Sequence, residues 1–267
     1  MDKQQKIKFT AIVITYNDCR YLNDCLKSLE FCEELIVFDL GSNDASIDIA
    51  KNYGAKVYHH KKTIIVEKVR KKAISYSKND WIVFIDPDEI APPNIGDIFH
   101  SIILENTDLG VVYLPWQFYI KDKPLTFTIW GQEKRKAFLF HKNRNVFNPY
   151  VHNVFSLIDG YKSISLPYSE KFCVNHFWIN SYKQLFEKHI RYIKAEGEAR
   201  YNQGQRFLWS IWAKETIYAL KLNLCDYRGL LNGYIGIFLS FFYAWYINMS
   251  YLSLLRYQKK IDREISS

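Results

Sequence analysis

The amino-acid sequence predicts an α/β fold in which a mostly parallel sheet is flanked by helices. Strand and helix patterns alternate from residue 9 to residue 86, as they do in doubly wound domains. The predicted strands are near-continuous apolar runs, which are typical of a sheet covered on both faces. The chain has 267 residues and is 48% hydrophobic, so it can enclose one sizeable core.

The N-terminal part of the chain supplies four strands and three helices in order. The strands are expected at 9–16, 34–40, 55–60 and 81–86. The first helix follows its strand and places four apolar side chains on one face: Leu22, Cys25, Leu26 and Leu29. The sequence "SNDASIDIAKNYG" predicts a capped helix that Gly54 ends, and a basic helix is expected over roughly 64–78.

From about residue 110 the pattern changes to shorter strands between turns. "SYKQ" at 181–184 is a capping box that opens a helix, and a further helix is expected over roughly 206–222. We therefore divide the chain into an α/β domain, 1–228, and a C-terminal helical tail, 229–267. Within the domain, the change of pattern separates the parts 1–110 and 111–228.

Residues 229–255 contain no charged side chain, whereas cations stand on both sides, at Arg228 and Arg256. The length would suit one membrane span. Asparagines, serines and many aromatic residues favour a pair of helices lying in the membrane interface. An ordinary buried helix is the third interpretation. Both membrane interpretations place the flanking cations against anionic head groups.

The overall charge balance points to an anionic partner. The net charge is +8, which suits nucleic acid, a phosphorylated substrate or acidic lipid. No strand motif with interleaved aromatic residues and cations indicates nucleic acid. The five cysteines show no metal-ligand spacing, and "MDKQQKIKF" at the N-terminus has no apolar signal core, so we expect reduced thiols in a cytoplasmic setting.

The stretch "DWIVFIDPDEIAPP", residues 80–93, places three carboxylates directly after a buried strand. In open α/β sheets, ligands bind at the carboxyl ends of the strands. Thr15, Tyr16 and Asn17 follow the first strand and Asp39 ends the second, so these residues should line the same edge. Two aspartates one residue apart, Asp86 and Asp88, suit a hard divalent cation such as Mg²⁺ or Mn²⁺ that also binds phosphate. The alternative is a polar strand end that caps the next helix.

The usual glycine-rich phosphate loops are absent from this sequence. No GxGxxG follows the first strand and no GxxxxGK[ST] occurs. Binding of a phosphate ligand by a metal ion and by side chains is the arrangement that remains.

Three blocks, "AIVITYND", "LIVFDLGSNDAS" and "WIVFIDPDE", resemble the inverting GT-A glycosyltransferases of family two. The similarity is greatest to the bacterial branch that glucosylates lipopolysaccharide core or related lipid-linked glycans. "VHN" at 151–153, the stretch "NHFWINSYKQLFEKHIRYIKAEGEA" and the uncharged tail extend it through most of the chain. The resemblance implies a GT-A (Rossmann-like) fold with a membrane-associating extension, in which 1–110 would be a nucleotide-binding half and 111–228 an acceptor half. It also implies transfer of a hexose or N-acetylhexosamine from a UDP-sugar to a membrane-bound glycan or glycolipid.

The resemblance also assigns roles to individual residues. Thr15 and Asn17, with Tyr16 between them, would border the nucleotide, and Asp39 would bind the edge of the uracil. Arg70 would approach the diphosphate, although it could equally belong to a solvated helix face. The acidic turn would supply the remaining contacts: Asp86 to the ribose and the metal ion, Asp88 to the metal ion, and Glu89 as an orienting residue.

The catalytic base is where the sequence departs from the family. A "VHE" triplet is common in this branch, but here the triplet ends in Asn153, which cannot accept a proton. Glu133, among the cations of "WGQEKRK", and His152 are the candidates. His176 could line the acceptor side or could be a core histidine.

Two other functional classes stay open at this level. A haloacid-dehalogenase-type phosphatase also has an aspartate pair after an apolar strand. A catalytically inactive protein that binds a nucleotide sugar or a membrane surface is the second. For the transferase, we expect a peripheral or monotopic position on the cytoplasmic face of the inner membrane.

Overall fold

The computed structural model describes residues 7–61, 66–147 and 155–266. The chain forms two compact units. Unit 1 comprises residues 1–117 and 133–177, and unit 2 comprises residues 118–132 and 178–267. The segment 118–132 and residues 178–267 thus belong to one compact unit, and the division into a domain, 1–228, and a tail, 229–267, stays a prediction. The nucleotide-binding and acceptor halves stay a prediction.

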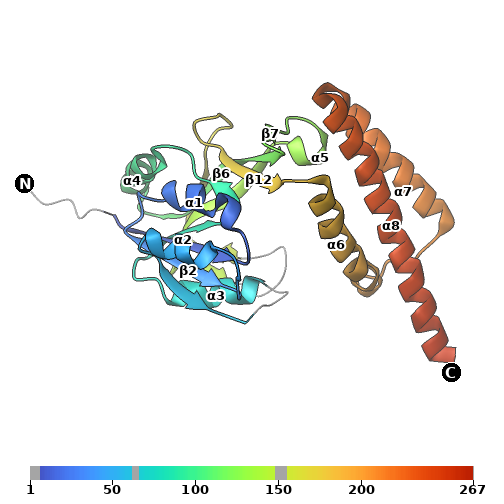
Figure 1. Cartoon of the computed structure of the whole chain (residues 1–267), viewed down its shortest axis with the longest axis horizontal. Helices are drawn as coiled ribbons and strands as arrows, with labels where there is room; N and C mark the ends of the chain where they lie inside the picture. The colour runs from blue at the N-terminus through green and yellow to red at the C-terminus, as the bar shows by residue number, and fades with distance from the viewer. Residues whose placement is uncertain (1–6, 62–65, 148–154, 267) are drawn as a thin grey trace, which may run out of the picture. The chain divides into compact units, whose positions relative to one another are not determined.

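Unit 1 is built on a sheet whose first four strands are parallel (Figure 1). In space their order is β3-β2-β1-β4. These are the four predicted strands: β1 (Phe9–Thr15), β2 (Glu34–Asp39), β3 (Lys56–His59) and β4 (Trp81–Ile85). The helices that connect or follow them are α1 (Cys19–Lys27), α2 (Ser46–Asn52), α3 (Val66–Ser75) and α4 (Ile95–Glu105). The α/β class is confirmed.

Beyond β4 the sheet becomes mixed. Strand β8 (Lys134–His141) lies antiparallel to β4, with Trp81 opposite His141. The order continues as β8-β6-β12-β5, and β5 pairs antiparallel with β12. These strands are β6 (Leu109–Ile120), β12 (Val174–Ile179) and β5 (Glu89–Ile90), with β7 (Lys123–Pro124) and β11 (Lys162–Ser165) paired to β6. A separate two-stranded sheet joins β9 (Asn145–Phe147) to β10 (Phe155–Leu157).

The sheet is buried on both faces, which explains the continuous apolar runs. Along β1, Ala11 and Val13 face one core with Leu22 and Leu26 of α1. Ile12 faces the opposite core, which includes Phe38 of β2, Phe84 of β4 and Val69 of α3. Since successive side chains of a strand point to opposite faces, a strand between two helical layers needs apolar residues at every position.

Unit 2 is mainly helical. Its elements include α5 (Thr128–Gly131), α6 (Tyr182–Asn202), α7 (Trp209–Lys221), the short helices η1 (Leu222–Asp226) and η2 (Gly229–Asn232), and α8 (Gly233–Ser266). The capping box at the start of α6 is confirmed: Gln184 N donates to Ser181 Oγ at 3.1 Å, and Asn180 N donates to Gln184 Oε1 at 2.8 Å.

The uncharged segment does not form the expected pair of helices. After η2 it belongs to one continuous helix, α8, of 34 residues. Its polar residues do not break the helix, since Ser240 Oγ donates to Gly236 O at 2.7 Å within it. Within the described part of the chain, one helical stretch, Gly229–Glu264, is long and apolar enough to cross a membrane by length and composition.

Candidate functional site

The carboxyl ends of β1, β2 and β4 lie side by side at one edge of the sheet in unit 1. Thr15 is the parallel partner of Asp39, and Val13 is the partner of Ile85, the residue before Asp86. The structure therefore brings the predicted residues of three chain segments to one edge, as expected for a ligand site of an open α/β sheet.

The loops after β1 and β2 hold each other in place. Asn17, which has a left-handed backbone with φ of 55°, donates its N–H to Ser42 Oγ at 2.9 Å and accepts from Asn43 N at 2.8 Å. Tyr16, which precedes Asn17 in the sequence, is 37% exposed, whereas Thr15 is buried. Asn17 and Tyr16 can therefore contact a ligand directly. Thr15 is enclosed at the end of β1 and can only support the loop that carries them.

Asp39 is buried, and its carboxylate already accepts several hydrogen bonds. Ser42 N donates to Oδ1 at 2.9 Å, Gly41 N donates to Oδ2 at 3.1 Å, and His59 Nδ1 lies 3.2 Å from Oδ2. Burial alone would raise the pKa of Asp39, but the hydrogen bonds from Ser42, His59 and Gly41 hold this pKa below its ordinary value. Asp39 thus initiates a turn and stays ionised, and its carboxylate is almost fully enclosed by these partners.

The acidic turn after β4 is surrounded by cations. Asp86 Oδ1 lies 3.2 Å from Arg70 Nη2, and Asp86 Oδ2 lies 3.7 Å from Lys136 Nζ. Lys136 also pairs with the fully buried Glu89, whose Oε2 accepts from Asp86 N at 2.7 Å. The Lys136 ammonium is buried, yet the carboxylates of Asp86 and Glu89 raise its pKa. Glu89 is a structural anchor of the turn, whereas Asp86 remains partly exposed.

Asp88 is held by a different set of contacts. Its backbone carbonyl accepts from Phe177 N at 2.8 Å, and its Oδ2 lies 3.3 Å from His176 Nε2. The His176 ring stacks on Trp116, with ring centroids 4.9 Å apart and planes 4° from parallel. Strand β12 therefore braces Asp88, because His176 pairs with Glu89 across the β12–β5 ladder.

The structure adds two residues that the sequence did not single out. Lys136 is one of the cations of "WGQEKRK", and its position on β8 turns it toward Asp86 and Glu89. Asp18 follows Asn17, and burial raises its pKa to about 6, with the charges of Asp88, Asp44 and Asp86 adding to the effect. Asp18 is therefore a third carboxylate beside the Asp86 and Asp88 pair.

We expect Asp18→Asn to stabilise the protein at alkaline pH. The folded state holds the Asp18 proton more tightly than the unfolded chain, so the carboxyl costs stability as pH rises from about 4 through about 6. The substitution should raise the free energy of unfolding by about 1–3 kcal/mol at pH 8 and change it little at pH 4. Urea unfolding at both pH values measures this, and a variant less stable at pH 8 would contradict it.

The arrangement of carboxylates fits a divalent cation that brings its own additional ligands. Among the described residues, no group of three or more His, Cys, Asp or Glu side chains is arranged to hold a metal ion. Mg²⁺ usually binds one or two carboxylates and completes its shell with water and substrate phosphates. The pKa of Asp18 is raised mainly by burial, and a cation at Asp86 and Asp88 would offset the smaller contribution that their charges make.

The two candidate bases are not brought to this turn by any described contact. Glu133 is exposed and stands just before β8. His152 and Asn153 lie outside the described residues.

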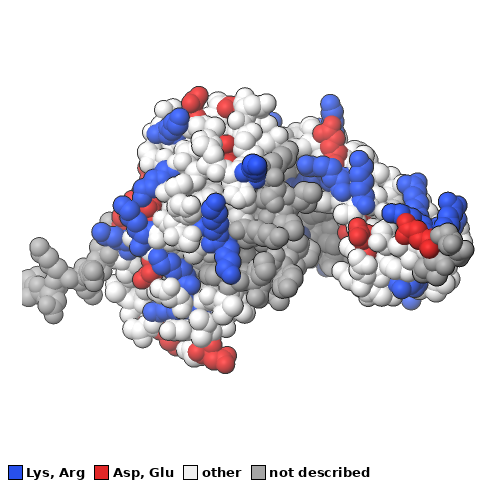
Figure 2. Space-filling model, turned by 90° about the horizontal axis from the view of Figure 1, so that it is seen from below, with Lys and Arg blue, Asp and Glu red and all other residues white. Residues whose placement is uncertain are grey.

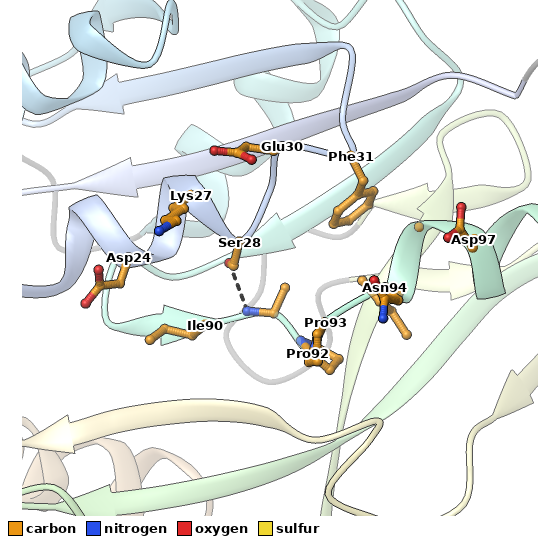
Figure 3. A pocket seen from close by; sticks show the side chains of 13 residues that line it. Asp24, Lys27, Ser28, Glu30, Phe31, Ile90, Pro92, Pro93, Asn94 and Asp97 are labelled. Carbon is orange, nitrogen blue, oxygen red and sulfur yellow. Dashed lines mark hydrogen bonds between the residues drawn. The ribbon is translucent and has the colours of Figure 1, made fainter.

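A pocket of about 600 Å³ lies on another part of unit 1, between α1 and the segment that leads to α4 (Figure 3). Three carboxylates, Asp24, Glu30 and Asp97, line it with one lysine, Lys27. None of the predicted site residues lines this pocket. Its acidic lining would repel a diphosphate, so the strand ends remain the candidate for an anionic ligand.

Fold and site together define an α/β protein with a candidate ligand site at its strand ends, and comparison with known proteins specifies the family. A model described as glycosyl transferase family 2 matches residues 10–159, more than half of the chain. The chain belongs to this family. The phosphatase alternative does not fit this membership.

Individual relatives match over shorter stretches. EpsH of Bacillus subtilis (strain 168) is 35% identical over 111 residues, covering 38% of this chain and 32% of EpsH. The lipopolysaccharide core biosynthesis glycosyltransferase LpsC of Rhizobium meliloti (strain 1021) is 35% identical over 48 residues, covering 18% of each chain. The matches thus span about a third or less of these curated relatives. A crystal structure of S. aureus TarS 1-349 in complex with UDP aligns with 23% identity, 43% coverage of this chain, 36% coverage of TarS and a TM-score of 0.36.

Proposed function

We propose that this chain is an inverting, metal-dependent glycosyltransferase that moves a hexose or N-acetylhexosamine from a UDP-sugar to a membrane-bound glycan or glycolipid. Its setting would be bacterial surface polysaccharide or lipopolysaccharide synthesis. Family membership supports sugar transfer. The observation that carries the donor site is the acidic turn of Asp86 and Asp88 beside the ends of β1 and β2.

The uracil and the diphosphate of the donor would each have protein partners at this edge of the sheet. Asp39 would accept from the uracil, with Tyr16 and Asn17 beside it and Thr15 behind them. Asp88 and Asp86 would hold Mg²⁺ or Mn²⁺, which would offset charge on the departing UDP when bound. Arg70 and Lys136 carry positive charge at Asp86, and such fixed cations stabilise charge that develops on a leaving group.

The acceptor hydroxyl must lose a proton as it attacks the anomeric carbon. A base within hydrogen-bond reach of that hydroxyl would take the proton. Glu133 and His152 remain the proposed candidates. Asp88 and Asp86 are unsuited to this role because both would bind the cation.

The proposed location is the cytoplasmic face of the inner membrane. The long apolar helix α8 supports membrane association, and the cations that flank the uncharged segment suit anionic head groups. A lipid-linked acceptor would then be presented at the surface on which the enzyme rests.

Calorimetric titration with UDP, with and without Mn²⁺, tests the donor site. We expect binding that strengthens at least tenfold when Mn²⁺ is present, because the cation joins the diphosphate to Asp86 and Asp88. Absence of UDP binding under both conditions would contradict the proposed donor. UDP binding without turnover of any UDP-sugar would favour the catalytically inactive alternative.

A further inference from the structure

Unit 2 exposes many large apolar side chains that its own helices do not cover. Of the nineteen large hydrophobic residues that are exposed in the described parts of the chain, ten fall between Leu208 and Phe241. Among the most exposed are Ile217 on α7 at 69%, and Leu231 and Tyr234 near the start of α8 at 65% each. Clustered exposed apolar residues mark a surface that contacts another molecule or a membrane.

Leu230, Leu231 and Tyr234 form what we call the helical tip, between η1 and the body of α8. The structure holds this tip rigidly. Asn232 Nδ2 donates to Phe127 O at 3.2 Å, and Thr126 Oγ1 donates to Asn232 Oδ1 at 3.0 Å. Gly236 packs so closely that a Cβ added there would lie 1.8 Å from Gly229 O. The leucines are therefore fixed in an exposed position by tertiary contacts.

Further exposed residues form a stripe along α8 and another along α7. On α8, Tyr234, Ile237 and Phe241 are exposed and are spaced by three and four residues, so they share one side of the helix. On α7, the exposed residues at the same kind of spacing alternate between apolar side chains and lysines: Ile211, Lys214, Tyr218 and Lys221. Such a mixture is typical of helices that lie in a membrane interface, where lysines extend toward the head groups.

Two cations, Arg228 and Lys123, stand next to the tip, although the apolar segment itself has none. Arg228 stands immediately before η2 and is exposed. Lys123 Nζ lies 5.6 Å from the centroid of the Tyr234 ring. Figure 2 views the part that contains α6–α8 from the end opposite the tip, where Lys and Arg side chains, with a few Asp and Glu among them, lie along one edge of an uncharged surface. Apolar side chains with cations beside them complement a bilayer with anionic head groups.

The packing of α8 argues against a membrane span. Its middle lies close against α6: Ser253 Oγ donates to Ile193 O at 2.8 Å, and the Tyr246 hydroxyl donates to Glu196 at 3.1 Å. A Cβ added at Gly197 of α6 would lie 2.5 Å from Ser253 O. Helix α6 is charged along its length, at Lys183, Glu187, Lys188, Arg191, Lys194, Glu196, Glu198 and Arg200. A spanning α8 would draw these charges into the hydrocarbon, which is costly.

We propose that the helical tip inserts into the head-group region of an anionic bilayer, together with the side of α7 that carries Ile211, Lys214, Tyr218 and Lys221. Helix α8 would then lie along the membrane. This proposal rests on the proposed function for its membrane-bound acceptor and adds the residues that make the contact. The predicted membrane-associating tail is 229–267. The proposal restricts the inserted residues of this tail to the helical tip and adds α7 to the contacting surface.

Vesicle flotation with the purified full-length chain tests this surface, in the absence of any sugar donor. We expect the wild-type chain to float with vesicles of phosphatidylcholine and phosphatidylglycerol, and much less with phosphatidylcholine alone. Each buried leucine is worth about tenfold in an equilibrium constant. The double variant Leu230→Glu with Leu231→Glu should therefore bind about a hundredfold more weakly. Leu104→Glu is the matched control, because Leu104 in α4 is 52% exposed and Leu230 is 56% exposed.

Three results would overturn the proposal. The first is a wild-type chain that does not float with anionic vesicles, and the second is a double variant that floats like the wild type. The third is a stable dimer in solution that the double variant converts to a monomer, which would assign this surface to a second copy of the chain.

UDP titration on the same double variant separates the membrane proposal from the donor-site proposal: retained UDP affinity with lost flotation locates the defect at the membrane surface. A wild-type chain that floats with anionic vesicles but does not bind UDP would contradict the proposed donor site and leave the proposed membrane surface in place.

Discussion

Asp88→Ala is expected to abolish the Mn²⁺-dependent part of UDP binding and to lower kcat by about a hundredfold or more. Asp88 is partly exposed, with 29% of its side chain accessible, and is oriented by His176 at 3.3 Å. Its removal takes away one of the two proposed cation ligands without opening the core. Calorimetric titration with UDP and measurement of released UDP check the two effects.

Asp24→Ala is the matched control for this experiment. Asp24 is an exposed carboxylate on α1 that lines the acidic pocket rather than the strand-end site. Its removal should leave UDP binding and turnover close to the wild-type values. Full activity in the Asp88 variant would remove Asp88 from the mechanism. Equal losses in the Asp24 variant would show that the effect comes from net charge and not from a specific cation site.

The parallel strands could be predicted because their signal is local and strong. The expected runs 34–40 and 81–86 became β2 and β4, each ending one residue earlier. In β4 the last residue expected, Asp86, is polar and belongs to the turn. Strand β5 could not be predicted in this way, since it has two residues and exists only because Asn175 and His176 pair with Ile90 and Glu89. A pairing between such distant segments leaves no periodic pattern in either of them.

The sequence predicts a pair of interfacial helices because asparagines, serines and aromatic residues are typical of the membrane interface, whereas the structure has one continuous helix, α8. Ser240, Asn248 and Ser250 lie inside α8 without interrupting it. Ser240 bonds within the helix and Ser253 bonds across to α6. A serine or threonine in a helix can satisfy its hydroxyl on a backbone carbonyl, so its presence in an apolar run does not decide between one helix and two.

The candidate site was predicted as a set of strand ends, but not in its electrostatics. The sequence placed Asp86 and Asp88 beside Thr15 and Asp39, and the parallel register agrees. It did not indicate that Lys136 would be buried, because a lysine in the run Lys134–Lys136 is usually solvated. Burial of a charged side chain depends on partners that only the folded sheet brings together.

Lys136→Met is expected to cost about 3–5 kcal/mol of folding stability. The Lys136 ammonium pairs with Glu89, which is fully buried, and only 12% of the lysine side chain is accessible. Removing this cation leaves an uncompensated carboxylate inside the protein, whereas Asp86 keeps Arg70 as a partner at 3.2 Å. Urea denaturation followed by circular dichroism measures the loss.

The double variant Lys136→Met with Glu89→Gln shows whether this loss comes from the buried pair. Glutamine can still accept from Asp86 N, as Glu89 does at 2.7 Å, but it leaves no charge behind. We therefore expect the double variant to recover most of the lost stability. A double variant no more stable than the single one would contradict this explanation.

The same double variant also separates stability from donor binding. If it is stable and binds UDP with wild-type affinity, Lys136 serves the fold by neutralising Glu89. If it is stable and binds UDP more weakly, the ammonium at Asp86 also contributes to holding the diphosphate. Lys136 would then join Arg70 among the cations of the donor site.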